Sequence, residues 1–222
     1  MRMRDFLWGV GLDYAWAFST RAGWLLHRTP PALTEGTRRP VLLIPGVYEP
    51  WRYLLTVGLR LHAAGHPVHV LPELRLNVAP IAESADLAHR YLVAHDLRDV
   101  AVVGHSKGGI IGKHMMAFDD VDGRVDRMVA ISSPFGGSDR AKYVPLRPLR
   151  PFLPGDALLA ALAANLELNS RITSVFTETD QVIPNGSYLE GATNIVVPLV
   201  GHFRLLSDPR VIDIIETAVG VD

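Results

Sequence analysis

Cysteine is absent from the 222 residues of the chain. Disulfides, thiolate nucleophiles, iron–sulfur clusters and zinc sites with Cys ligands are therefore excluded. An excess of positive charge is also lacking, because 22 basic and 23 acidic side chains give a net charge of -1. A protein that binds nucleic acid needs a cationic surface for the phosphates, so we expect no nucleic-acid partner.

The chain also lacks an unbroken apolar run that could span a membrane. A spanning helix needs about 20 apolar residues, but Asp13 and Arg21 interrupt the apolar stretch from Phe6 to Leu26. A basic start gives this stretch some features of a secretory signal sequence, although its apolar run is short for one. We therefore expect residues 1–40 to form a helical extension and a linker, packed on the domain. Cytoplasmic localisation is favoured over secretion.

Residues 41–222 have the length and composition of one folded domain. Hydrophobic residues make up 48% of the sequence and charged residues 20%, which excludes intrinsic disorder. Six short runs are rich in Val and Ile and do not alternate with polar residues, as is typical of strands buried on both faces of a parallel sheet. These runs are Val41–Ile44, Val68–Leu71, Val100–Val103, Met128–Ile131, Ile172–Phe176 and Ile195–Val200.

Segments with helical patterns separate these runs. They are Trp51–Ala64, Ile81–His95, Gly108–Phe118, Ala157–Leu168 and Asp208–Ala218. This alternation predicts right-handed crossovers and a doubly wound, mostly parallel sheet of about six strands flanked by helices. In such an α/β sheet, functional residues collect at the carboxyl ends of the strands.

The pattern is lost between Asp139 and Gly155, where prolines recur every three residues. The segment also carries four cations, which are Arg140, Lys142, Arg147 and Arg150. We expect an excursion above the sheet, and both a lid over residues 139–168 and a solvated loop remain open. Contact with a lipid surface through residues 1–30 or 139–155 is a further expectation.

The strongest motif is Gly104-His105-Ser106-Lys107-Gly108-Gly109, which follows an apolar run and precedes a helical segment. This is G-x-S-x-G between a strand and a helix, the pattern of a nucleophile elbow. The glycines leave room for a sharp turn that forces strained backbone angles on Ser106. The pattern predicts that Ser106 is a nucleophile.

A serine hydroxyl needs a base, and the sequence offers one farther along the chain. His202 ends the last strand-like run, and Asp180 ends the run before it. We predict that His202 takes the proton of Ser106 and that Asp180 holds the imidazole and stabilises its charged form. Glu178 and Asp139 are rival acids, but Glu178 is expected within the strand and Asp139 follows a different one.

Stabilising the oxyanion of an acyl-transfer reaction requires two N–H donors. One is expected from the backbone of Lys107, directly after the predicted nucleophile. The other is expected from the backbone of Val47, in the turn that follows the first strand at Pro45-Gly46.

Three histidines, His62, His66 and His69, have a spacing that zinc sites also use. Gly65 and Pro67 break the helix that would align them, and no carboxylate lies near in sequence. Surface and turn histidines are the favoured interpretation, so we expect no metal.

From about Val41 to Ala218 the sequence resembles an α/β-hydrolase, and within that superfamily the small bacterial serine lipases and esterases with a minimal sheet. The motifs that carry the resemblance are Leu43-Ile44-Pro45-Gly46, Gly104-His105-Ser106-x-Gly-Gly, Ile131-Ser132-Ser133-Pro134-x-Gly-Gly-Ser138, Asp180-x-Val-Ile-Pro184 and Gly201-His202. The order Ser…Asp…His agrees with that superfamily. The chain departs from it at Pro45, where His is more common, and at Lys107, which puts a cation beside the nucleophile.

The resemblance implies hydrolysis of acyl esters or lipids through an acyl-enzyme, with no metal and no cofactor. A thioesterase or acyltransferase with the same triad is the enzymatic alternative. A non-catalytic binding protein of the same fold is the alternative from another class, because fold alone does not decide function. The natural substrate, the acyl length and the oligomeric state do not follow from the sequence.

Overall fold

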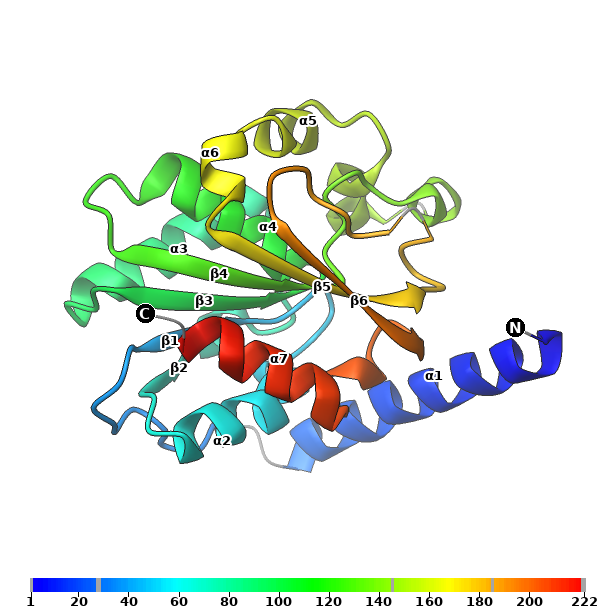
Figure 1. Cartoon of the computed structure of the whole chain (residues 1–222), viewed down its shortest axis with the longest axis horizontal. Helices are drawn as coiled ribbons and strands as arrows, with labels where there is room; N and C mark the ends of the chain where they lie inside the picture. Colours follow the sequence, from blue (N-terminus) through cyan, green and yellow to red (C-terminus); the bar gives the residue numbers. More distant parts are fainter. Residues whose placement is uncertain (1, 27–28, 145, 185, 221–222) are drawn as a thin grey trace.

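The computed structural model describes residues 2–26, 29–144, 146–184 and 186–220. Its centre is a six-stranded, fully parallel sheet with the strand order β2-β1-β3-β4-β5-β6 (Figure 1). The strands are β1 (Val41–Ile44), β2 (Val68–Val70), β3 (Val100–His105), β4 (Val125–Ile131), β5 (Ile172–Thr179) and β6 (Thr193–Val200). The predicted doubly wound sheet is therefore confirmed.

Helices cover both faces of the sheet (Figure 1). One face carries α3 (Ile81–Ala94), α4 (Lys107–His114), α5 (Ala157–Ala163) and α6 (Leu166–Asn169), and the other carries α1 (Met3–Leu26), α2 (Leu55–Ala63) and α7 (Pro209–Gly220). Successive strand residues alternate between the two resulting cores. In β1, for example, Leu42 and Ile44 pack toward α3 and α4, whereas Val41 and Leu43 pack toward α2 and α7.

The segment above the sheet is more regular than its sequence predicts. Residues 139–155, expected as an irregular excursion, contain two 3-10 helices, η4 (Asp139–Tyr143) and η5 (Arg147–Phe152). One of the prolines behind that prediction, Pro145, lies outside the described residues. Short 3-10 turns suit this sequence because proline fixes φ near the helical value. Its missing N–H costs no hydrogen bond in the first turn of a helix.

The predicted helix Ala157–Leu168 is two helices. Asp156 caps α5 with its side chain, as its sequence position indicates, by accepting from the N–H groups of Leu158 and Leu159. Helix α5 ends at Ala163, and the side chain of Asn165 then caps α6 by accepting from the N–H of Leu168. Asn165 favours this break because its side chain competes for backbone hydrogen bonds inside a helix.

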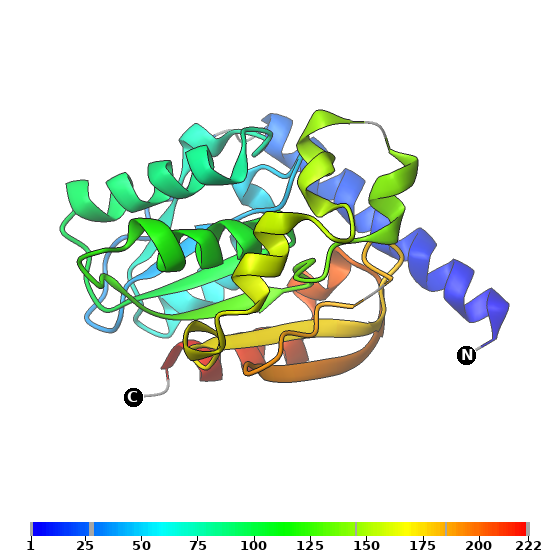
Figure 2. The ribbon, with the colours of Figure 1, turned by 90° about the horizontal axis from the view of Figure 1, so that it is seen from above.

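Helix α1 lies at the end of the molecule where the strands finish, and its first turns project beyond the other elements (Figures 1 and 2). It packs through Trp16, whose ring meets the edge of Tyr53 at 5.6 Å, and through the backbone oxygen of Ala17, which accepts from the Tyr53 hydroxyl at 2.9 Å. Among the described residues, no helix combines the length and apolarity needed to cross a membrane.

Candidate active site

Ser106 lies in the sharp turn between β3 and α4. Its φ of 52° and ψ of -119° are strained for a residue with a side chain. The two flanking glycines make this turn possible. A Cβ at Gly104 would lie 2.5 Å from the carbonyl carbon of Gly108, and a Cβ at Gly108 would overlap the backbone oxygen of Ile44. The turn that the motif predicts is therefore present, and it holds the Ser106 side chain at the carboxyl end of β3.

The structure brings Asp180 and His202 together at the ends of β5 and β6. Nδ1 of His202 donates to Oδ2 of Asp180 at 2.7 Å, and both residues are buried. The other carboxylate oxygen of Asp180 accepts from the N–H groups of Val182 and Ile183 at 2.7 and 2.8 Å. These bonds fix the carboxylate and leave Nε2 of His202 as the ring nitrogen for a substrate or nucleophile.

The pKa values of Asp180 and His202 are both shifted from their ordinary values. Burial alone would raise the pKa of Asp180, but the charge and the hydrogen bond of His202 outweigh it, so that the pKa lies below its ordinary value. Burial alone would lower the pKa of His202, but Asp180, with smaller contributions from Glu49 and Asp13, raises that pKa above its ordinary value. Both pKa shifts show that the charged forms of Asp180 and His202 stabilise each other. This arrangement suits an imidazole that receives a proton during a reaction.

The two rival acids lie elsewhere. Glu178 belongs to β5 and its side chain is exposed. Asp139 forms an ion pair with Lys142 at 2.6 Å. Of these three acids, Asp180 is the one that is hydrogen-bonded to the His202 ring.

The loop after β1 is held in place by hydrogen bonds to its backbone. The N–H of Gly46 donates to Oε2 of Glu49 at 2.7 Å, and the backbone oxygen of Pro45 accepts from the side chain of Asn77 at 2.6 Å. Within the part of the chain that the structure describes, the N–H groups of Val47 and Lys107 donate to no protein acceptor. The N–H of Gly46 is already bonded to Glu49, whereas the N–H groups of Val47 and Lys107 are free of a protein acceptor among the described residues. These two are the donors that the sequence predicts for the oxyanion.

The cation of Lys107 is tied to the protein. Its Nζ donates to the backbone oxygens of Asn77 and Ala79 at 2.8 and 2.5 Å, and burial lowers the pKa of Lys107 to about 8. The side chain forms one wall of a cavity of about 290 Å³, which Val78, Ile81 and η5 also line. A larger groove of about 800 Å³ lies at the opposite edge of the sheet, between the start of β5 and α7.

Sequence reasoning missed two buried acids near His202. Glu49 accepts from Nδ1 of His105 at 2.8 Å, and Nε2 of that ring lies 2.9 Å from the backbone oxygen of His202. Asp13, in α1, accepts from the N–H of His202 at 2.9 Å. The local signal for Asp13 was a carboxylate in an otherwise apolar stretch, which usually means that the group has a buried partner.

Glu49, His105 and His202 also bring three ligand atoms within 4.8 Å of one another, as a metal site would. The hydrogen bonds just described account for this arrangement without an ion, because each of the three side chains already has a protein partner. Among the described residues, His62, His66 and His69 form no such group. Two of these rings have separate protein partners. Nδ1 of His66 bonds to the backbone oxygen of Arg39, and Nδ1 of His69 bonds to the hydroxyl of Tyr91.

No protein-family model and no curated protein sequence matches this chain. Solved structures do resemble it. A hydrolase from Oleispira antarctica is 16% identical with a TM-score of 0.60, over 85% of this chain and 93% of that one. The mature form of a Bacillus licheniformis lipase is 12% identical with a TM-score of 0.60, over 86% and 95% of the two chains. An esterase from Exiguobacterium antarcticum is 13% identical with a TM-score of 0.58, over 84% and 93%. Together with the six parallel strands and the turn at Ser106, these likenesses show that the chain has the α/β-hydrolase fold.

Proposed function

We propose that the protein is a serine hydrolase of acyl (carboxylic) esters, of the lipase or esterase type. The observation that carries the proposal is the strained turn at Ser106, at the same edge of the sheet as the hydrogen-bonded pair Asp180–His202. Nucleophile, base and orienting acid are thus supplied by the ends of three strands, in the order used by α/β-hydrolases.

In the proposed reaction, Ser106 Oγ attacks the ester carbonyl carbon while Nε2 of His202 takes its proton. The negative charge on the carbonyl oxygen is met by the N–H groups of Lys107 and Val47. The tetrahedral intermediate collapses, His202 gives the proton to the leaving alcohol, and the acyl group stays on Ser106. Water then repeats the sequence, with His202 again as the base, and releases the carboxylic acid. The cavity beside Lys107 is the proposed space for the acyl chain.

The alternatives differ in what leaves or accepts the acyl group. A thioesterase or an acyltransferase would use the same three residues. The lipase and esterase among the fold neighbours favour ester hydrolysis. The strained turn at Ser106 favours a catalytic protein over a non-catalytic binding protein, because strained residues gather at active sites.

Labelling with a fluorophosphonate tests the proposal. Ser106 Oγ should attack phosphorus and expel fluoride, and peptide mass spectrometry should find the adduct on Ser106. The Ser106→Ala variant is expected to remain unlabelled, whereas Ser133→Ala, which alters a buried serine outside the turn, should label like the wild type. An unlabelled wild-type protein would support the non-catalytic alternative. Rates on esters of increasing acyl length and on acyl-CoA thioesters then separate the enzymatic alternatives.

We also propose that the edge of the sheet with Ser106 meets an anionic lipid surface. Large apolar side chains of α1 are 40% to 81% exposed, namely Leu7, Trp8, Tyr14, Phe18, Leu25 and Leu26. Between Phe6 and Leu26 the two charged residues face the protein, because Asp13 is buried and Arg21 donates to the backbone of Tyr48. The outer face of this part of the helix is therefore uncharged.

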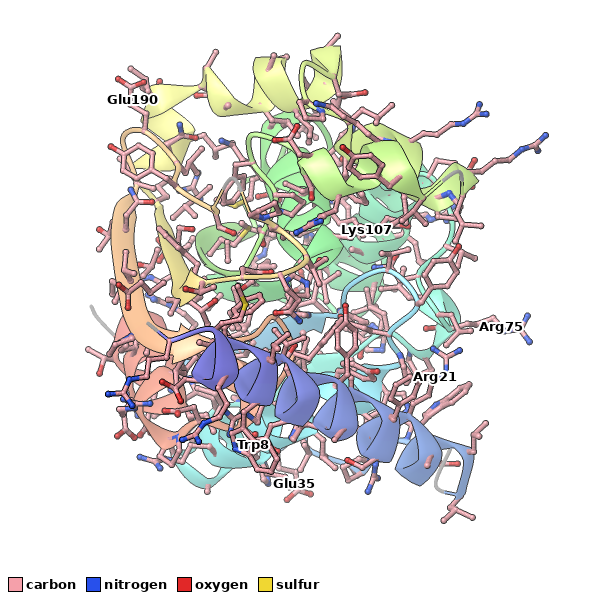
Figure 3. The ribbon with its side chains drawn as sticks, turned by 90° about the vertical axis from the view of Figure 1, so that its right-hand side faces the viewer. Trp8, Arg21, Glu35, Arg75, Lys107 and Glu190 are labelled. Atoms are coloured by element: carbon pink, nitrogen blue, oxygen red, sulfur yellow. The ribbon has the colours of Figure 1, made fainter. Side chains whose placement is uncertain are left out.

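Cations accompany this apolar face. Arg2 and Arg4 are exposed at the start of α1, and Arg140 and Arg150 are exposed in the segment 139–152. Figure 3 looks onto this side of the molecule, with α1 crossing the view and Lys107 between α1 and that segment. Apolar side chains with flanking cations fit the boundary of an anionic membrane, where each cation contributes about 1 kcal/mol that salt screens.

The double change of Arg140 and Arg150 to Gln is therefore expected to weaken binding to vesicles with 30% phosphatidylglycerol by roughly 30-fold at low salt, because the two cations together contribute about 2 kcal/mol. Turnover of a soluble short-chain ester should stay unchanged, because neither side chain takes part in the proposed chemistry. Sedimentation of the vesicles at low and high salt measures the binding. Arg90 in α3 and Arg98 just before β3 are exposed cations, each paired with an acid, and changing both to Gln is the comparison that should have no effect. Equal binding by both double variants would contradict the proposal.

A further inference from the structure

Asp13 is a fully buried carboxylate in α1, far from the predicted triad in sequence. Its Oδ2 accepts from the N–H of His202 at 2.9 Å and from Nε2 of Gln181 at 2.6 Å. Its Oδ1 accepts from the N–H groups of Phe203 and Arg204 at 2.8 and 2.7 Å. A buried carboxylate is tolerated only when its oxygens are well paired, and here four donors converge on two oxygens.

These four donors belong to two different loops. Three are consecutive backbone N–H groups that begin at His202, and the fourth is the side chain of Gln181, directly after Asp180. One carboxylate therefore ties the loop of the predicted base to the loop of the predicted acid. The hydrogen bond between His202 and Asp180 spans the same two loops, so its geometry depends on how they are held.

We propose that Asp13 is a positioning residue of the active site, which holds the His202 loop at its working distance from Asp180 and from Ser106. The inference rests on the proposed function. It makes α1 a structural part of the proposed catalytic apparatus.

The neighbours of Asp13 are shaped for this contact. Gly201 has a φ of +131°, and a Cβ there would overlap the Asp13 carboxylate. On α1, a Cβ at Gly9 would lie 2.8 Å from Cβ of Val200 at the end of β6. Glycine on both sides lets the helix approach β6 closely enough for the carboxylate to reach three backbone N–H groups. The same helix also holds the loop after β1, because Nη1 of Arg21 donates to the backbone oxygen of Tyr48 at 2.6 Å.

Asp13 also acts on His202 through its charge. The imidazole is faced by the carboxylates of Asp180, Glu49 and Asp13 and by the ring of His105, whose centroid is 4.8 Å away. Each carboxylate raises the pKa of His202. Removing the charge of Asp13 should therefore move the acid limb of the kcat/KM profile, where His202 loses its proton, to lower pH.

The test is Asp13→Asn in the full chain. Asn keeps the shape and one acceptor oxygen, but its NH₂ group, in the place of Oδ2, cannot accept from the N–H of His202. We expect kcat for a soluble ester to fall about 10- to 100-fold with little change in KM, because a small displacement of a catalytic group is costly and the substrate contacts are untouched. The acid limb should move to lower pH. Asp5→Asn, at an exposed acid in the first turn of α1, is the matched control and should change neither quantity.

A folded Asp13→Asn variant with wild-type kcat and an unmoved acid limb would overturn the inference, since Asp13 would then serve stability alone. If that variant does not fold, Gly9→Ala decides. It keeps the carboxylate but pushes α1 away from Val200, and it should lower kcat while the acid limb stays in place. Wild-type kcat in Gly9→Ala would likewise overturn the inference. The fluorophosphonate reaction of the wild type keeps the two questions apart, because it reports on Ser106 whatever the outcome at Asp13.

Discussion

Replacing Ser106 with Ala is expected to leave a folded protein that hydrolyses short p-nitrophenyl esters at near-background rate. The proposed reaction forms its covalent bond at Ser106 Oγ, and without this oxygen His202 has no nucleophile to activate. The loss of kcat should be on the order of 10⁴-fold or more, as is typical when the nucleophile of a triad is removed. Ala has the same Cβ as Ser, so the strained φ of 52° gains no new contact and the fold should persist.

Ser132 provides a closely matched control for this experiment. It also follows a strand, β4, is fully buried, and has a positive φ of 44°. Ser132→Ala removes the same atom from a residue that also has a positive φ and lies directly after the neighbouring strand, so it should retain most of the activity. Initial rates, corrected for the amount of folded protein by circular dichroism, measure both variants. Wild-type turnover by Ser106→Ala would refute the assignment of the nucleophile.

Asp180→Asn is expected to fold normally and to lose about 10⁴-fold in kcat, the effect of the same change in a serine protease triad. The hydrogen bonds around Asp180 give a specific reason. Oδ1 accepts from the N–H groups of Val182 and Ile183, and an Asn side chain would keep its oxygen there. Its amide group would then face Nδ1 of His202 and donate to it. The imidazole would be held with its proton on Nε2, the nitrogen that must accept the proton of Ser106.

Glu178→Gln is the control, because Glu178 is an acid two residues earlier on the exposed side of β5. Its effect on kcat should be small. The same ester assay across pH 5 to 9 measures both variants. If Glu178→Gln proved the more damaging change, the catalytic acid would have to be reassigned to Glu178.

The sequence alone predicts the sheet because its strands are continuous Val- and Ile-rich runs, which few other structures explain. The turn at Ser106 is equally local. Three glycines in six residues between a strand and a helix suit only a sharp turn, and the close approach of Gly108 to Ile44 is the physical counterpart of that pattern. The pairing of Asp180 with His202 could be predicted because parallel strands bring their carboxyl ends to one edge.

The roles of Asp13 and Glu49 could not be predicted in this way. Each acts through contacts with residues remote in sequence, Asp13 with His202 and Glu49 with His105, and no local pattern announces such a partner. From the sequence, Asp13 is only a charged residue that interrupts the apolar stretch from Phe6 to Leu26. The break between α5 and α6 was missed for a different reason. The apolar spacing of Leu159, Leu162 and Leu166 continues across it, whereas the capping by Asn165 is a local competition.

The bond between α1 and the His202 loop has a consequence for how the protein becomes active during synthesis. The helix leaves the ribosome before the His202 loop, since 189 residues separate Asp13 from the backbone N–H that it holds. At about 5–20 residues per second, the helix waits on the order of ten seconds or more for that partner. The central strands can pair in the meantime, but the His202 loop cannot be fixed until β6 has emerged. A ribosome-bound chain should thus pair its central strands before the His202 loop is fixed, and removal of α1 by a protease afterwards should lower the proposed activity without touching Ser106, Asp180 or His202.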